Sequence, residues 1–325
     1  MNYCIYKLNF TAPLHCGRGD GAVSLTNTSM TLHADTVFSA LCNEAALMSD
    51  KNAVKELVNL CQKGKLLFSD TFPFCGNELY LPVPLCPLKD NVAFDVKNRK
   101  KIKAVKWLPA SEKYLSAFSD YINKGNMFDD ESITTKFTQS RTDIKACISR
   151  DEDDTAPFEI SCVEFKENCG LYGIVGYENK DDLNFVLRLL ESLGISGIGG
   201  QTSRGFGKFN VQITENKFLT EHIKAEKNFY MLLTSSLPKS NEIGKTLDGA
   251  FYSLIRRGGF SLSPYIGNTI KKQTQYYLVS GSVLKNKFDG DVFSVGENGS
   301  HAIYRYAKPL FLGIDLYEPH QRICQ

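Results

Sequence analysis

The stretch Leu193–Phe209, LGISGIGGQTSRGFGKF, closes one expected helix and opens one expected strand, and it decides how the chain is interpreted. It holds six glycines within fourteen residues, a density expected only where the backbone needs a positive φ or another backbone approaches closely. It also offers backbone N–H groups, a hydroxyl and two cations, which are groups that hold phosphate oxygens. We therefore predict a loop that binds a nucleic-acid backbone through Gly197, Gly199, Gly200, Ser203, Arg204 and Lys208.

Other phosphate-binding motifs do not fit the sequence. A Walker A loop ending at Gly244-Lys245-Thr246 would need a glycine where Lys239 stands. The segment 17–22, GRGDGA, matches a loose dinucleotide-binding pattern, but β-branched and polar residues follow it where that motif requires a helix. The RNP1 motif of RNA-recognition domains is matched only in its first residues, because Lys208 occupies the place of an aromatic residue.

Length and composition limit the class of protein. With 325 residues the chain is long enough for two domains, and 42% hydrophobic with 23% charged residues is ordinary for a soluble protein. A formal net charge of +2 argues against a free-standing, non-specific DNA-binding protein, yet it allows a subunit that holds a short nucleic acid locally. We find no long apolar run at the N-terminus or elsewhere, so we expect a cytoplasmic protein without a membrane segment.

The ten cysteines do not indicate a metal site. They form no C-x-x-C pair, and no histidine stands at zinc-ligand spacing beside them. We therefore expect small buried hydrophobic residues, and neither a metal nor a cofactor.

The order of predicted elements favours an α+β fold with two domains. A strand at 3–10 is followed by helices, a hairpin, strands at 158–166 and 170–177, a helix ending at Gly194, and a closing strand at 209–214. This βαββαβ order is that of a ferredoxin-like domain over residues 1–216, with an insertion at about 85–157. Residues 217–325 are expected to form a second small α+β domain.

The insertion carries a basic block beside Trp107 that contains no acidic residue. Long insertions between core strands are often functional, so we predict an extended arm or hairpin here. The block consists of Lys97, Arg99, Lys100, Lys101, Lys103 and Lys106.

Several motifs together resemble a known family. They are PLHCG at 13–17, HADTVFSAL at 33–41, the glycine-rich stretch, RGGF at 257–260, GSV at 281–283, and YRY at 304–306 with Lys308. The pattern resembles the RAMP superfamily of CRISPR-associated RNA-binding proteins. Within that superfamily it is most similar to the fourth subunit of the type III-A (Csm) effector complex.

The resemblance implies two ferredoxin-like (RRM-like) domains and a non-catalytic role in antiviral defence. Family members hold the repeat-derived 5′ handle of the guide RNA (crRNA). They contact the large, polymerase-like palm-domain subunit on one side and the first guide-coating backbone RAMP subunit on the other. A projecting β-hairpin, or thumb, lies against the guide–target duplex, and here the resemblance places that thumb and the target RNA at the basic block of residues 97–106.

Further RNA-binding residues are expected outside the glycine-rich stretch. His15, Gly17 and Arg18 follow the first strand and should lie near the loop, and Arg256 and Arg257 are either RNA contacts or part of a solvated turn. Another candidate is Arg305, which points away from the face shared by its two tyrosine neighbours, and those tyrosines are expected in the core. The pair Lys271 and Lys272 is expected to add only general electrostatic attraction.

Two other functions remain open at this stage. The first is a RAMP-type, metal-independent endoribonuclease that processes precursor guide RNA, for which His15 would act as the base or acid. We expect no enzyme, because no second histidine or tyrosine is placed convincingly beside it, and Asp35 is better explained as a helix cap. The second is a protein–protein adaptor without RNA contact, which leaves the glycine-rich loop unexplained.

Overall fold

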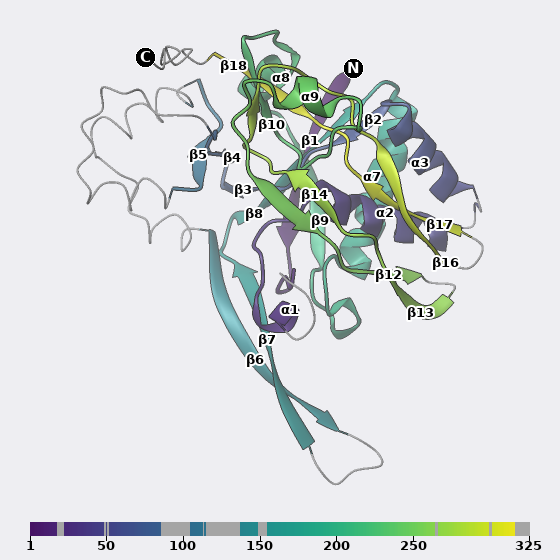
Figure 1. Cartoon of the computed structure of the whole chain (residues 1–325). Helices are drawn as coiled ribbons and strands as arrows, with labels where there is room; N and C mark the ends of the chain where they lie inside the picture. Colours follow the sequence, from purple (N-terminus) through teal and green to yellow (C-terminus); the bar gives the residue numbers. More distant parts are fainter. Residues whose placement is uncertain are drawn as a thin grey trace, which may run out of the picture.

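The computed structural model of the chain describes residues 1–17, 23–48, 50, 52–85, 105–112, 114, 137–148, 155–263, 266–298 and 301–315. In these residues α-helices combine with antiparallel β-sheets (Figure 1), as predicted for an α+β protein.

The largest sheet has seven strands: β1 (Asn2–Phe10), β2 (Leu66–Phe68), β3 (Phe72–Cys75), β4 (Glu78–Pro82), β5 (Trp107–Pro109), β8 (Cys169–Tyr177) and β9 (Phe209–Thr214). Strand β1 lies between β8 and β9 and is antiparallel to both. On its other edge β8 pairs with β2 and with β3, and the sheet continues from β3 through β4 to β5. Both neighbours of β1 therefore come from distant parts of the sequence.

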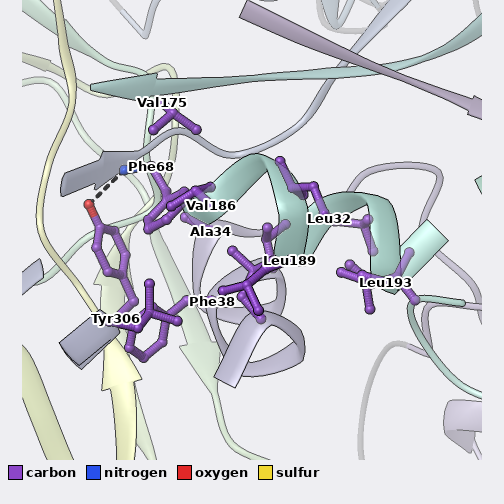
Figure 2. Close-up of a cluster of buried hydrophobic side chains, with 14 of the residues drawn as sticks. Leu32, Ala34, Phe38, Phe68, Val175, Val186, Leu189, Leu193 and Tyr306 are labelled. Atoms are coloured by element: carbon purple, nitrogen blue, oxygen red, sulfur yellow. Dashed lines mark hydrogen bonds between the residues drawn. The ribbon is translucent and has the colours of Figure 1, made fainter. Parts of the chain in front are cut away.

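One face of this sheet is covered by helices. They are α2 (Ala34–Leu47), α3 (Ala53–Gln62) and α7 (Lys180–Ser196). Apolar residues of β1 such as Tyr6 and Leu8 pack with Phe38 of α2 and Val186 of α7 in one buried cluster. Tyr306 from the C-terminal half enters the same cluster, where its hydroxyl accepts a hydrogen bond of 2.9 Å from the Phe68 N–H (Figure 2).

The opposite face of the sheet packs against the C-terminal half. Ile5 of β1 and Ile174 of β8 share a second buried cluster with Phe229, Met231 and Leu312. Because alternate residues of a strand point to opposite faces, β1 is buried on both sides by different parts of the chain. The helices, the main sheet and the C-terminal half thus form successive layers.

The described residues of the C-terminal half form one small sheet and three two-stranded ribbons. The sheet has the order β15 (Val283–Leu284), β10 (Phe229–Leu232), β18 (Phe311–Ile314). The ribbons are β11 (Leu254–Arg257) with β14 (Gln275–Leu278), β12 (Phe260–Ser263) with β13 (Ile266–Lys271), and β16 (Val292–Asn298) with β17 (His301–Tyr306). Two short helices, α8 (Lys217–Lys224) and α9 (Ile243–Leu247), complete this half.

A long two-stranded hairpin projects from the body of the molecule (Figure 1). It is formed by β6 (Thr138–Ile148) and β7 (Thr155–Phe165), paired along their whole length. The sequence predicts most of β7 but not β6. At its base Val163 bridges to Leu14, so the hairpin starts beside the segment that follows β1.

Part of the predicted arm and of the predicted sites lies outside the described residues. This holds for Arg18 and for the basic-block residues Lys97, Arg99, Lys100, Lys101 and Lys103. Lys106 is described: it is exposed and directly precedes β5. The short helix α1 (Val23–Thr26) occupies one turn where the sequence favours extended backbone.

No helix in the described part of the chain is long and apolar enough to cross a membrane. In the same residues, no three His, Cys, Asp or Glu side chains are grouped so as to hold a metal ion.

Candidate nucleic-acid interface

A cavity of about 300 Å³ lies where the two halves of the chain meet. It is bordered by the end of the segment after β1, by α2, by the glycine-rich loop and by the ribbons β11–β14 and β12–β13. Five predicted residues from four separate segments line it: Gly17, Gly199, Gly200, Arg257 and Arg305. The fold therefore brings these predicted residues together.

The glycines of the loop are required mainly by contacts within the chain. Gly199 and Gly207 have φ values of +94° and +71°, which L-residues with a side chain rarely adopt. A Cβ on Gly199 would collide with the carbonyl oxygen of His15, and one on Gly207 with that of Ile198. The sequence predicts that a nucleic-acid backbone approaches this loop, whereas the backbone that approaches these two glycines is the protein's own.

Hydrogen bonds fix the loop to the segment after β1. The Gly200 N–H donates to the His15 carbonyl at 2.8 Å, and the Gly207 N–H donates to the Pro13 carbonyl at 2.8 Å. Tight packing of the loop on residues 13–15 thus explains the glycine density and the PLHCG segment together.

The turn of this loop nevertheless keeps unpaired donors. Among the described residues, the N–H groups of Gly199, Gln201, Thr202 and Ser203 have no hydrogen-bond acceptor. Gln201 adopts a left-handed conformation with φ of +63°, which is uncommon for a residue other than glycine. Successive N–H groups around such a residue form a concave anion-binding turn. This geometry agrees with the predicted phosphate-binding role.

The predicted side chains of the loop face solvent. Ser203, Arg204 and Lys208 are exposed. The Arg204 guanidinium lies over the ring of Phe158 in β7, 5.5 Å from the ring centroid. It is therefore positioned between the loop and strand β7 of the projecting hairpin. Gly197 ends α7 with φ of +93°.

His15 is buried and its ring is held by the hairpin. Only 4% of it is exposed, and Nδ1 lies 2.6 Å from the carbonyl oxygen of Ser161 in β7. Because a carbonyl can only accept, Nδ1 carries the proton of this bond. The contact holds the ring as a link between the segment after β1 and the hairpin. Gly17, two residues later, is exposed at the mouth of the cavity.

Asp35 is not the helix cap that the sequence suggested. The cap position is His33, and the Ala34 N–H at the start of α2 donates to the buried carboxylate of Asp70 at 2.8 Å. Asp35 lies in the first turn and forms a bidentate pair with Arg257, at 3.0 Å from Nε and 2.7 Å from Nη2. An acidic residue near the start of a helix is typical of a helix cap and also of a side chain that pairs with a distant arginine. The sequence alone does not distinguish these two roles.

This ion pair controls the charge of Asp35. Burial alone would raise the pKa of the carboxyl, but the adjacent Arg257 guanidinium outweighs burial and holds the pKa below its ordinary value. Arg257, predicted either as an RNA contact or as part of a solvated turn, is thus tied to α2 with 21% of its side chain exposed.

Arg305 is buried rather than presented at the surface. Only 2% of it is exposed, and its guanidinium donates to the carbonyl oxygens of Arg257, Gly258 and Gln273 at 2.8, 3.0 and 2.8 Å. Such a side chain orders the cavity wall, and this position does not favour direct contact with RNA. Its neighbour Tyr306 is fully buried, as predicted, and Arg256 is exposed on the face of β11 opposite Arg257.

Two of the cavity-lining residues that were not predicted as binding residues are Lys272 and Phe260. Lys272 was expected to add only general attraction, and Phe260 was noted only as the last residue of RGGF. Both belong to the hairpin β12–β13 or its end. Their proximity to α2 depends on pairing that sequence spacing does not reveal.

Comparisons with known proteins agree on one family. The model of the RAMP superfamily matches residues 7–210, and that of the CRISPR Csm4 C-terminal domain matches residues 225–314. The "CRISPR system Cms protein Csm4" of Mycobacterium tuberculosis is 31% identical, covering 97% of this chain and 98% of its own length. That of Streptococcus thermophilus is 30% identical, covering 97% of this chain and 100% of its own.

Solved structures show the same fold. A chain of the Csm3–Csm4 subcomplex of a type III-A CRISPR-Cas interference complex has a TM-score of 0.65 and 18% identity. A chain of a Csm1–Csm4 cassette in complex with cA4 has a TM-score of 0.62 and 18% identity. Each match covers 97% of this chain and 99% of the other.

Proposed function

The chain belongs to the RAMP superfamily and, within it, to the Csm4 subunits of type III-A CRISPR effector complexes, and from that premise we propose that it holds the repeat-derived 5′ handle of the guide RNA. The observation that carries the proposal is the convergence of the glycine-rich loop, Gly17 and the basic C-terminal ribbons on one cavity. Next to it, the unpaired N–H groups of Gly199 and residues 201–203, together with the exposed Arg204 and Lys208, are the proposed phosphate donors.

We also propose that the chain consists of two ferredoxin-like domains, 1–216 and 217–325. For the first, the strands run β9, β1, β8 and then β2 with β3 across the sheet, which is fourth, first, third, second in chain order. That order is expected of the βαββαβ unit. For the second, the support is coarser: a small antiparallel sheet, β15–β10–β18, in which α9 follows β10 along the chain.

We propose that the partners are a large palm-domain subunit and a guide-coating backbone subunit. Solved structures with this fold are a Csm1–Csm4 cassette and a Csm3–Csm4 subcomplex. A thumb against the guide–target duplex also belongs to this proposal. The basic block that ends at Lys106 remains its predicted place, and the projecting hairpin β6–β7 is a second candidate (Figure 1).

The geometry around His15 supports a structural rather than a catalytic subunit. The ring is buried and its Nδ1 is bonded to the Ser161 carbonyl, so this nitrogen is not available to a ribose hydroxyl. Metal-independent RNA cleavage requires groups for the 2′-hydroxyl, the leaving oxygen and the phosphate charge together.

Binding of repeat-derived RNA to the full-length chain tests the proposal. We expect Arg204→Met and Lys208→Met each to weaken RNA binding. Each should also reduce the slope of log affinity against log salt concentration by about 0.7, because one phosphate contact on a single strand contributes that amount. Arg188→Met, an exposed arginine on α7 away from the loop, is the matched control and should bind as the parent does. Failure of the parent chain to bind RNA would support the adaptor, and cleavage of repeat RNA by the chain alone would support the nuclease.

A further inference from the structure

The cavity carries more positive than negative charge. Its wall contains the cations Arg257, Arg305 and Lys272, and the single carboxylate of Asp35. Asp35 is engaged by Arg257 in two hydrogen bonds, and Arg305 is engaged by three backbone carbonyls. Lys272 is therefore left, among the described residues, without a strong hydrogen-bond or ion-pair partner.

Lys272 is partly buried without a counter-ion. Its Nζ donates to the Ser39 hydroxyl at 3.4 Å, and within the described part of the chain no carboxylate lies within ion-pair distance of it. Burial, and next to it the Arg305 charge, lower the pKa of Lys272, while Asp35 opposes this effect. An ammonium in this position is stabilised by a bound anion.

An exposed aromatic ring lies on the same hairpin. Phe260 lines the cavity, yet 58% of it is exposed. The Lys272 N–H donates to the Gly259 carbonyl at 2.9 Å, and Phe260 pairs directly with Lys271. Ring and ammonium therefore come from neighbouring positions of β12–β13. A ring beside a cation is the combination that binds a base together with its phosphate.

The facing wall and the size of the cavity limit what can enter. Across from the hairpin lie the hydroxyl of Ser39, the amide of Asn43 and the unpaired N–H of Gly199. A volume of about 300 Å³ is at the lower end of small-ligand sites, which span about 300–1,000 Å³. It has room for a single nucleotide and not for a duplex or a protein helix.

We propose that this cavity binds one nucleotide of single-stranded RNA, with its phosphate between Lys272 and the Gly199 N–H and its base stacked on Phe260. The proposal rests on the proposed function, because it assigns the cavity to the same RNA. It adds that one nucleotide leaves the strand and occupies a site built by both halves of the chain.

The test compares RNA binding by the full-length parent chain with that of Lys272→Met and Phe260→Ala. Lys271→Met, the exposed lysine next to it, and Tyr276→Ala, an exposed aromatic on the ribbon β11–β14, are the matched controls. We expect Phe260→Ala to weaken binding about 5- to 150-fold, the loss from one base–aromatic stack. Lys272→Met should reduce the salt slope by about 0.7, and both controls should behave as the parent.

A second measurement separates the cavity from general attraction to RNA. Uridine monophosphate, uridine and inorganic phosphate are added separately, and crosslinking of 4-thiouridine RNA to Phe260 is mapped by mass spectrometry. The proposal is supported if uridine monophosphate competes with RNA for the parent chain but not for Lys272→Met or Phe260→Ala. Both variants should unfold at the same temperature as the parent. Parent-like binding by both variants, or equal losses in the controls, overturns it and leaves the proposed function intact. If the parent binds no RNA, the proposed function itself fails.

Discussion

The ion pair between Asp35 and Arg257 joins the two halves of the chain beside the cavity. Asp35 comes from the first turn of α2 and Arg257 from β11, 222 residues later in the sequence. Burying two charges costs free energy, so such a pair contributes specificity and order more than net stability, whereas removing one partner is strongly destabilising. The pair holds β11, and with it the cavity wall, in place against α2.

We predict that Asp35→Asn lowers the free energy of unfolding at pH 7 by about 3 kcal/mol, because Arg257 is then left as an uncompensated buried charge. The double variant Asp35→Asn/Arg257→Met should be less destabilised than Asp35→Asn alone. Urea unfolding of the parent and both variants measures this. Equal or greater destabilisation of the double variant would show that the pair does not act through charge.

The same pair sets a pH dependence. The pKa of Asp35 is lower in the folded chain than in the unfolded chain, so the unfolded state binds the proton more readily. The contribution of Asp35 is therefore fully present above about pH 4 and is lost as the pH falls below that value. Urea midpoints between pH 7 and pH 3 should converge for the parent and Asp35→Asn, and a constant gap would contradict the assignment.

Two glycines of the loop make a matched pair. A Cβ at Gly207 collides with the Ile198 carbonyl, whereas nothing lies within 4 Å of a Cβ at Gly205, although both have positive φ. We predict that Gly205→Ala costs about 1 kcal/mol, from the left-handed conformation alone. Gly207→Ala should cost about 1–3 kcal/mol more, because the neighbouring backbone must move. Thermal unfolding of the two variants checks the difference. Equal losses of stability would show that the backbone around Gly207 can move at no cost in free energy.

At the level of elements, the sequence predicted the parts whose residues are buried periodically. Strand β1, helices α2 and α7, and strand β9 were expected because one or both of their faces enter the core. Strand β6 was missed because most of its described residues are exposed, so it shows no alternation of apolar and polar residues. Its backbone is satisfied by β7 alone.

The candidate site was predictable in its local motifs and not in its long-range contacts. The glycine-rich loop, Gly17 and Arg257 were found because glycine and arginine runs are visible in short windows. Lys272 and Phe260 were missed because only the pairing of β12 with β13 and its packing near α2 places them at the cavity. The spacing of residues along the chain does not predict that contact.

The hairpin β6–β7 should be separable from the fold. Lys145 and Phe158 are directly paired, so replacing residues 146–157 by Asn-Gly closes the ribbon with a two-residue turn. We predict that thermal stability changes by no more than a few degrees, because the described residues of the removed part belong to none of the buried clusters. Handle binding should be retained and binding of a guide–target duplex weakened. A large loss of thermal stability would instead place the hairpin in the folding core.

At the scale of the whole molecule, the two proposed domains share two buried clusters. Tyr306 packs between Phe38 and Phe68 of the N-terminal half, with ring centroids 5.6 Å from each. The Asp70 carboxylate accepts from the Ser235 N–H at 3.0 Å, and the Thr234 hydroxyl donates to the Phe68 carbonyl at 2.7 Å. Buried polar groups of each half are thus satisfied by the other, so separation would leave them unpaired.

We therefore predict that residues 1–216 expressed alone lack a cooperative unfolding transition, and that adding residues 217–325 in trans restores one. In the intact chain, Tyr306→Ala should cost about 3–5 kcal/mol, since it empties a fully buried aromatic site and removes the acceptor of the Phe68 N–H. Calorimetry of the fragment, alone and mixed, decides the first point. A sharp transition in residues 1–216 alone would show that the N-terminal sheet and its helices are sufficient, and that the cavity between the halves forms by docking of two prefolded units.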